Sequence, residues 1–284
     1  MTEVFLNGDF ETIEDACVSA MDAGLLLGAG LFETLRAYDR TVFRIDDHLQ
    51  RLFASAQALE IPIALAADQI ADALAETLDR NGLDDARCRI TVTRGALPGE
   101  VGAEARPTCL VTAGVMTPYD EQLYARGMTV TVSDATVNPS DPTAGHKTTA
   151  YMTNLLVLRD AHARGAQEAL RLNTRGRLCE GAISNVFLVR QGRLLTPPLE
   201  EGCLPGVTRK VVLEIARREG IDAAEESIAG PDLLKADELF LTNTIMEVMP
   251  VCRIERHPVG NETVGPITQR LMRLYREQVE SEIR

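Results

Sequence analysis

The feature that most constrains this chain is a run of short strand patterns in its second half that no helix interrupts. Residues 168–197 include EALRLN, RLCEG and SNVFLVRQGRLLTP, with turn pairs at Arg175-Gly176 and Gln191-Gly192. Short apolar runs separated by such pairs predict hairpins. A doubly wound parallel sheet needs a helix between successive strands, so the sequence predicts an α+β fold instead.

Helical patterns lie on both sides of this run. Apolar residues recur at three- and four-residue steps in 46–61, where Asp46 or Asp47 is available as an N-cap, and 68–82 reads as a helix capped by Asp68. Three further helices are expected, at 151–165, 208–220 and about 266–283. Further strands are expected at 3–8, 41–45, 87–95, 108–115, 128–134 and 237–243.

The length of the chain suggests two domains. It has 284 residues, and a typical domain has roughly 100–150. The segment VMTPYDEQLYARG breaks the strand pattern near the middle of the chain. We therefore predict a smaller N-terminal α+β domain at 1–117, an interdomain linker at 118–124 and a larger C-terminal domain at 125–284.

The charge balance argues against two classes of partner. Lys and Arg number 29 and Asp and Glu 42, which gives a net charge of −13. Nucleic acids and anionic membranes are bound by dense positive surfaces, so we expect neither as a partner. No apolar stretch approaches the ~20 residues of a membrane span. The six cysteines lie far apart without a C-x-x-C pair, which is typical of free thiols in a reducing compartment, so a cytoplasmic protein is expected.

The four histidines predict no metal site, because they are scattered without an i, i+4 pair. His146 is interpreted as a polar neighbour of Lys147. His48 lies one turn before Arg51 and is interpreted as solvated helix surface.

Four segments carry residues suited to one cofactor. Lys147 precedes a helix in GHKTTAYMTNLL, and Glu180 enters an apolar strand in RLCEGAISNVF, where burial calls for a cationic or protonated partner. After Pro205-Gly206 a helix starts at Val207 or Thr208, and its free N–H groups suit an anion. Arg51 offers a bidentate partner for a phosphate. A covalently linking lysine, a carboxylate for a pyridine nitrogen and a phosphate cup are what pyridoxal 5′-phosphate requires.

In their order and neighbouring residues, these segments resemble the fold-type IV (class IV) pyridoxal-phosphate aminotransferases. This family includes the branched-chain and D-amino acid aminotransferases and 4-amino-4-deoxychorismate lyase. The resemblance covers almost the whole chain. It implies a two-domain fold of the D-amino acid aminotransferase type, pyridoxal 5′-phosphate as cofactor, small amino and keto acids as substrates, and a homodimer. It rests on GAGLFETLRAY, HLQRL, HKTTAYMTNLL, EGAISNVFLV, LPGVTRKVV and DELFLTNTIMEVMPV.

The resemblance also implies a role for each candidate residue. Lys147 is expected to link covalently to the cofactor, and Glu180 to bind its pyridine nitrogen. Leu204 is expected to pack against the ring, and Tyr151 to lie near the phenolic oxygen. The phosphate is expected to be held by Arg51, Val207, Thr208 and Thr244.

The substrate residues depart from the subtypes of this family. Branched-chain enzymes carry Tyr-x-Arg where this chain has Arg87-Cys88-Arg89, and D-amino acid enzymes carry Tyr at the position of Phe32. The loop GALPGEVGAEARP, at 95–107, lacks the Arg-x-His pair of the D-amino acid enzymes. We expect Arg89 to pair with the substrate carboxylate, and Phe32 and Leu27 to form an apolar wall.

These residues predict a transaminase that moves an amino group between a small or branched aliphatic amino acid, L or D, and a 2-oxo acid such as 2-oxoglutarate or pyruvate. The alternative is 4-amino-4-deoxychorismate lyase, which would use the same lysine and cofactor. A binding protein without activity is disfavoured, because Lys147, Glu180 and the phosphate residues are all present.

Overall fold

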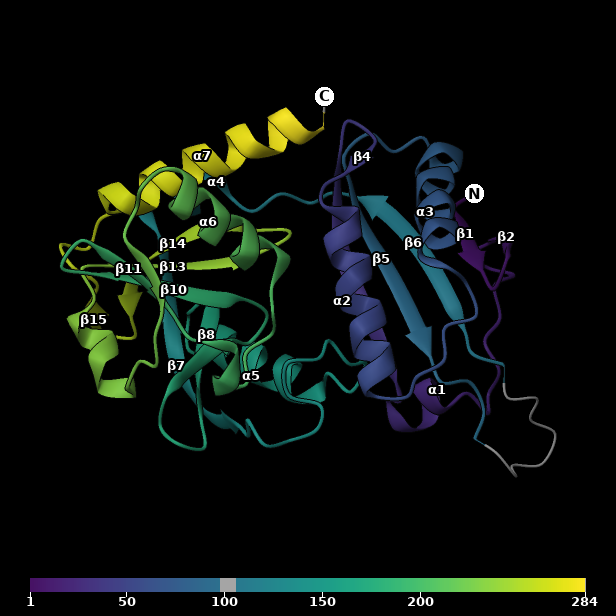
Figure 1. Ribbon diagram of the computed structural model, residues 1–284, viewed down its shortest axis with the longest axis horizontal. Coiled ribbons are helices and arrows are strands. Elements are labelled where there is room, and N and C mark those ends of the chain that lie inside the picture. The colour runs from purple at the N-terminus through teal and green to yellow at the C-terminus, as the bar shows by residue number, and fades with distance from the viewer. Residues whose placement is uncertain (98–105, 284) are drawn as a thin grey trace. The chain divides into compact units, whose positions relative to one another are not determined.

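The computed structural model describes residues 1–97 and 106–283, which form two compact units (Figure 1). The first unit contains Met1–Thr117, His146–Tyr151 and Glu282–Arg284, and the second contains Pro118–Gly145 and Met152–Ser281. The segment His146–Tyr151 thus groups with the first unit, although its neighbours in sequence on both sides belong to the second. Of the loop at 95–107, residues 98–105 lie outside the described residues.

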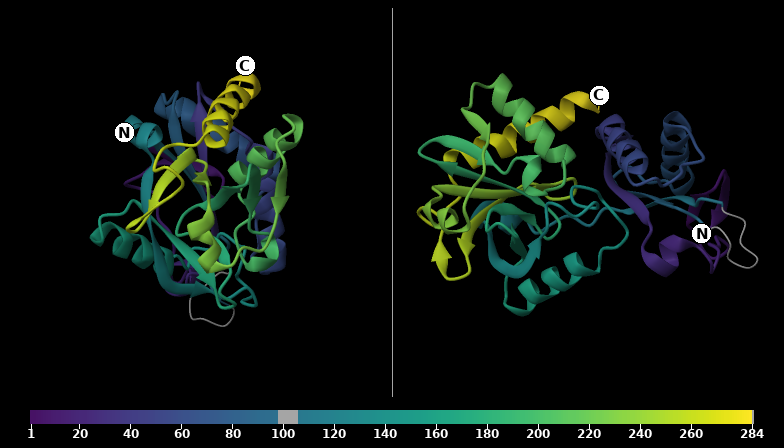
Figure 2. Two further views of the ribbon diagram at one scale, coloured as in Figure 1. Left: turned by 90° about the vertical axis from the view of Figure 1, so that its left-hand side faces the viewer. Right: turned by 60° about the horizontal axis from the view of Figure 1, so that its bottom comes forward.

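Within its described residues, the first unit contains a six-stranded antiparallel sheet in the order β2-β1-β6-β5-β3-β4. Two helices, α2 (Ile45–Ala58) and α3 (Ala67–Asn81), lie on one side of this sheet (Figure 2). The core between them and the sheet is apolar and includes the fully buried Leu35, Leu74 and Ile90. The remaining elements of this unit are β1 (Glu3–Leu6), β2 (Asp9–Thr12), α1 (Ala23–Leu27), β3 (Gly30–Tyr38), β4 (Thr41–Val42), β5 (Ala86–Thr93) and β6 (Cys109–Val115).

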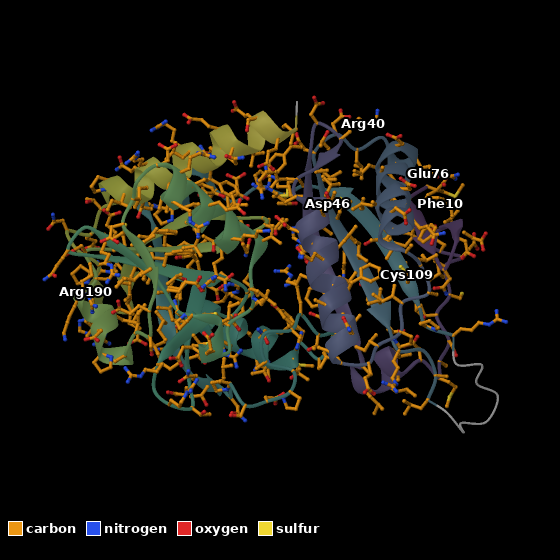
Figure 3. All side chains as sticks on the ribbon, viewed as in Figure 1. Phe10, Arg40, Asp46, Glu76, Cys109 and Arg190 are labelled. Carbon is orange, nitrogen blue, oxygen red and sulfur yellow. The ribbon has the colours of Figure 1, made fainter. Side chains whose placement is uncertain are left out.

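The starts of α2 and α3 differ from the sequence prediction. The N-cap of α2 is Arg44, in the left-handed conformation and without a side-chain cap, so Asp46 lies in the first turn (Figure 3). The N-cap of α3 is Ala66, and Asp68 again lies in the first turn. Carboxylates in a first turn still favour the positive end of the helix dipole. The strand expected at 41–45 is only Thr41–Val42, because the chain turns into α2 directly afterwards.

The described part of the second unit contains a nine-stranded mixed sheet in the order β12-β11-β10-β13-β14-β7-β8-β9, with β15 paired to β14. Strand β7 is parallel to both β14 and β8, and β11 is parallel to β12. The hairpins predicted from the turn pairs are present as β8–β9 and β10–β11. The strands are β7 (Met128–Val137), β8 (Glu168–Asn173), β9 (Leu178–Gly181), β10 (Asn185–Arg190), β11 (Arg193–Thr196), β12 (Ala223–Glu225), β13 (Glu238–Asn243), β14 (Glu247–Ile254) and β15 (His257–Pro258).

Helices pack on several parts of this sheet. Helix α5 (Met152–Ala163) contacts β7 and β8, and α6 (Val207–Arg218) contacts β12 and β13. Residues 118–124, which the sequence favours as a linker, belong to this unit and include the start of α4 (Glu121–Arg126), capped by Asp120. The side chain of Leu123 packs against the core of the unit. The other helices are η1 (Leu199–Glu201), η2 (Gly230–Lys235) and α7 (Pro266–Glu282).

Mixed helices and strands without a regular β-α-β alternation confirm the predicted α+β class. Among the described residues, no helix combines the length and the apolar character that crossing a membrane requires.

Two valines of β6 test the energetics of the first unit. Val111 is fully buried in the core, whereas Val115, on the same strand, is 77% exposed. We predict that Val111→Ala lowers the free energy of unfolding by about 2 kcal/mol through lost burial and a residual cavity, and that Val115→Ala changes it by less than about 0.5 kcal/mol. Urea unfolding followed by circular dichroism measures both; equal effects would contradict the packing described here.

Candidate active site

The candidate residues divide between the two units, and each half has its own geometry. The first unit holds Phe32, Arg51, Arg89, Lys147 and Tyr151. The second unit holds Glu180, Leu204, Val207, Thr208 and Thr244.

The backbone around Lys147 is held by the start of β3. The backbone N–H of Phe32 donates to the carbonyl of Lys147 at 2.9 Å, and the N–H of Thr149 donates to the carbonyl of Gly30 at 2.9 Å. Residue 148 thereby forms an antiparallel bridge with Leu31. A side chain at Gly30 would place its Cβ 2.9 Å from the Thr149 hydroxyl, so glycine permits this close approach.

Aromatic rings surround the lysine amine. The Nζ atom of Lys147 lies 4.4 Å from the ring centroid of Phe32 and 5.6 Å from that of Tyr151. The two rings meet edge-on, with centroids 5.2 Å apart. Ring faces attract a cation without accepting its proton.

The other two lysines of the chain have different surroundings. Lys210 lies 4.0 Å from Glu214 and Lys235 lies 2.7 Å from Asp232, and both side chains are more than half exposed. Lys147 is partly buried. Among three lysines, its setting is the one suited to a reactive amine rather than to a surface charge.

Arg89 lies on β5 beside the ring of Phe32. Its guanidinium carbon is 3.9 Å from the Phe32 ring centroid, and its Nε donates to the hydroxyl of Thr91 at 3.0 Å. Burial lowers the pKa of Arg89, and the charge of Arg87 lowers it further. Within the described part of the chain, no carboxylate forms an ion pair with Arg87 or Arg89. Two cations on one strand without an acid can serve an anionic substrate group.

Arg51 is bound to a buried acid that the sequence analysis did not identify. The carboxylate of Glu33 accepts from Arg51 Nε at 2.8 Å and from Nη2 at 2.5 Å, and it contacts His48 Nδ1 at 2.8 Å. Burial alone would raise the pKa of Glu33, but the Arg51 charge and the hydrogen bonds from His48 and Arg51 lower it to about 2.

His48 is not the solvated residue that the sequence suggested. Its side chain is 1% exposed, and burial lowers its pKa. The helix pattern around His48 does not show that β3 covers this position. On that strand Leu31, Glu33, Leu35 and Ala37 alternate, so Glu33 shares the core-facing side and was a visible signal of a buried acid. The interpretation of His146 agrees with the structure, where its Nδ1 lies 2.9 Å from the Ser55 hydroxyl.

In the second unit, one short segment connects the acid with a helix start. Glu180 is partly buried on β9, and its Oε2 accepts the backbone N–H of Leu204 at 2.9 Å. The carbonyl of Leu204 accepts from Asn185 Nδ2 at 2.8 Å. Helix α6 begins three residues later, at Val207. Both peptide groups of Leu204 are therefore fixed, and with them the spacing between the carboxylate and the helix.

The N-terminus of α6 suits an anion. Its N-cap is Gly206, which has no side chain to cap the first turn, and that turn contains no acidic residue. Thr208 does not cap the helix; it is buried within the first turn, next to Val207. First-turn N–H groups that no side chain caps, together with the helix dipole, favour a phosphate there. Thr244 follows β13 in a turn in which Asn243 Oδ1 accepts the N–H groups of Ile245 and Met246.

Comparison with known proteins identifies the family. Residues 30–254 match the family model for amino-transferase class IV. A Methanocaldococcus jannaschii protein with a provisional branched-chain-amino-acid aminotransferase name is 39% identical over 279 residues, covering 97% of this chain and 96% of that protein. A D-alanine aminotransferase of Staphylococcus haemolyticus is 32% identical over 287 residues, covering 99% of each.

Solved structures agree with the sequence relatives. The branched-chain amino acid aminotransferase of Escherichia coli has a TM-score of 0.92 at 30% identity, covering 99% of this chain and 96% of that one. The chain belongs to the class IV aminotransferases, and its fold is the two-domain α+β fold of that family. It is an enzyme of that class.

The residues present fit the cofactor of the family, pyridoxal 5′-phosphate. The Thermobaculum terrenum neighbour, a branched-chain aminotransferase at 27% identity and TM-score 0.88, was solved in its pyridoxal-phosphate form, covering 99% of this chain and 94% of that one. In the second unit of this chain, the Glu180 carboxylate binds Leu204 at one end of the segment 204–206. The uncapped N-terminus of α6 lies at the other end. A Cβ at Gly206 would lie 1.9 Å from Asn185 Oδ1, so the cradle requires glycine.

Gly206 gives a direct test of this cradle. In Gly206→Ala the new methyl group must displace the amide of Asn185, which releases the Leu204 carbonyl and loosens the helix start. We predict that the affinity for pyridoxal 5′-phosphate falls by roughly tenfold, the effect of losing one or two hydrogen bonds. Titration followed by visible absorption measures it. Gly114→Ala, where the added Cβ meets nothing within 4 Å, is the control; equal affinities for the two variants would contradict the cradle.

Proposed function

We propose that this chain is a pyridoxal-phosphate-dependent transaminase that moves an amino group from a branched-chain L-amino acid to a 2-oxo acid such as 2-oxoglutarate. The observation that carries the proposal is Lys147, the one lysine of three that is partly buried and set between aromatic rings. The relatives named as branched-chain aminotransferases support the substrate class.

Lys147 performs the central step in this proposal. Bound pyridoxal 5′-phosphate supplies an electron-accepting ring and an aldehyde carbon for the amino group. The Nζ atom of Lys147 would be the group that holds the cofactor covalently. As a neutral amine, Lys147 would serve as the general base for the proton on the substrate Cα. The backbone hydrogen bonds of residues 147 and 149 keep the amine close to Phe32 and Tyr151 throughout.

Glu180, Leu204 and the first turn of α6 hold the cofactor. The Glu180 carboxylate would accept a hydrogen bond from the protonated pyridine nitrogen, since an ionised acid favours the charged form of its partner. Leu204 packs on the ring. The phosphate is bound by Val207 and Thr208 in the first turn of α6, by Arg51 and by Thr244.

Arg89 binds the substrate carboxylate, and Phe32 forms an apolar wall for the side chain. The support is chemical: Arg89 stacks on Phe32 and has no acidic partner among the described residues. Its desolvated guanidinium gains from a carboxylate more than an exposed arginine would.

A D-amino acid transaminase is the second candidate. The observation that favours it is the 32% identity with a D-alanine aminotransferase over the full length of both chains. The lyase reaction is not favoured, because the relatives and structural neighbours reported above are named as aminotransferases.

We also propose a cytoplasmic homodimer. Large apolar side chains are exposed on α1 and α5, and a second copy of the chain would cover such surfaces. All six cysteines are free thiols and five of them are buried, which suits a reducing compartment. The exposed side chains are Leu25, Leu26, Leu27, Met152, Leu155 and Leu156.

Substitution of the two central residues tests the mechanism. Lys147→Ala is expected to abolish turnover and the visible band of the bound cofactor. Glu180→Gln is expected to keep the cofactor but slow turnover by roughly 10²–10⁴-fold, because an amide does not hold the ring nitrogen protonated. Lys235→Ala, which removes a surface lysine paired with Asp232, is the matched control. Near-normal turnover in Lys147→Ala or Glu180→Gln would overturn the corresponding assignment.

Paired L- and D-amino acids decide the substrate. Single-turnover mixing with each donor should convert the cofactor to its amine form fastest with L-leucine, L-isoleucine or L-valine. Faster conversion by D-alanine would replace the first candidate with the second. If no donor of either hand converts the cofactor, while 4-amino-4-deoxychorismate releases pyruvate, the transaminase proposal fails.

A further inference from the structure

The carboxylate of Glu33 is buried in the first unit at a position whose neighbours are apolar. Glu33 is 1% exposed and lies on the core-facing side of β3, with Leu31 and Leu35 as its neighbours on that side. Helix α2 packs against this side through Leu49 and Leu52. Moving a carboxylate from water into such surroundings is costly unless it is paired and hydrogen-bonded.

Two side chains of α2 meet this requirement. Arg51 donates from Nε to Oε1 at 2.8 Å and from Nη2 to Oε2 at 2.5 Å, which is a bidentate pair. His48, one helical turn earlier, lies with Nδ1 2.8 Å from Oε2. The Arg51 side chain is only 10% exposed, so little water screens the pair.

Stability alone does not explain this arrangement. Well-packed apolar residues are often as stabilising as a buried ion pair, and the rest of this strand–helix contact is apolar. A bidentate carboxylate does something that a leucine cannot, because it fixes the plane and the direction of the guanidinium. His48 in turn limits the positions open to the carboxylate.

We propose that Glu33 is a positioning residue that orients Arg51 toward the cofactor phosphate, and that His48 fixes Glu33 for this task. The inference rests on the proposed function, in which Arg51 binds the phosphate. Neither Glu33 nor His48 touches the cofactor in this account. Both act through the guanidinium.

The charges of the pair make the proposal testable. The carboxylate of Glu33 offsets the charge of Arg51, so the pair as a whole is neutral. Removing the carboxylate charge would leave Arg51 as a net cation, and charge alone would then strengthen phosphate binding. Positioning requires the opposite: without its bidentate partner the guanidinium loses its fixed direction, and phosphate binding weakens.

The experiment compares two forms of the cofactor in Glu33→Gln. The full-length chain, freed of cofactor, is titrated with pyridoxal 5′-phosphate and separately with pyridoxal, which lacks the phosphate, and both titrations are followed by visible absorption. We expect the dissociation constant for pyridoxal 5′-phosphate to rise roughly tenfold, about what the loss of one charge-assisted hydrogen bond costs. The constant for pyridoxal should not change. An unchanged or lower constant for pyridoxal 5′-phosphate would overturn the proposal, and so would an equal rise for both compounds.

A control variant separates positioning from general damage. Asp22 is also a buried carboxylate of the first unit, with hydrogen bonds from Thr93, Thr108 and Gly24 but none from Arg51. Asp22→Asn should leave the ratio of the two dissociation constants unchanged; a selective loss of pyridoxal 5′-phosphate here would refute the special role of Glu33. If Glu33→Gln does not fold, Glu33→Asp keeps the charge but shortens the reach, and the same selective weakening is expected.

Arg51→Gln distinguishes failure of this inference from failure of the proposed function. If Arg51→Gln weakens pyridoxal 5′-phosphate selectively and Glu33→Gln does not, Arg51 binds the phosphate and the positioning role of Glu33 fails. If Arg51→Gln affects both compounds equally, the phosphate role of Arg51 fails, and the inference fails with it.

Discussion

Two backbone hydrogen bonds to the start of β3 determine where the lysine of this enzyme lies. The carbonyl of Lys147 accepts from Phe32, and the N–H of Thr149 donates to Gly30. Through them a six-residue segment folds with the first unit although the chain on either side of it belongs to the second. The amine lies over the ring of Phe32, so backbone pairing contributes to the position of the lysine.

Each unit also buries a carboxylate that fixes a functional segment. In the first unit, Glu33 holds Arg51. In the second, Glu168 accepts the N–H groups of Ala182 and Ile183 and the hydroxyl of Ser184, the turn that directly follows β9 and Glu180. Burial raises the pKa of Glu168, while these hydrogen bonds oppose the rise. Glu33 thus holds a residue that is proposed to bind the cofactor, whereas Glu168 holds the turn that follows such a residue.

The sequence predicted the elements better than their contacts. Apolar periodicity located α2, α3 and α6, and turn pairs located the hairpins of β8–β9 and β10–β11, because these signals are local. Helix starts were less accurate, since Arg44 and Ala66 act as N-caps without the side-chain hydrogen bond that the prediction assumed. A left-handed backbone at a non-glycine residue such as Arg44 is uncommon, and the helix pattern does not indicate it.

The candidate site shows the same limit. The family resemblance identifies Lys147, Glu180 and Arg51, but the sequence pattern does not show that Glu33 and His48 are buried against each other. Their contact joins two different elements, β3 and α2. Periodicity along one element indicates which of its faces is buried but not which residues of another element cover that face. An acid among apolar residues on the core-facing side of a strand was the available signal.

The central claim, that Lys147 carries the cofactor, is tested most directly by reducing the holoenzyme with borohydride and mapping the modified peptide by mass spectrometry. The chain contains only three lysines, Lys147, Lys210 and Lys235, so the assignment is unambiguous. The account predicts the cofactor on the peptide that contains Lys147 and on no other. Its attachment at Lys210 or Lys235, or the absence of any attachment in a protein that binds the cofactor, would contradict it.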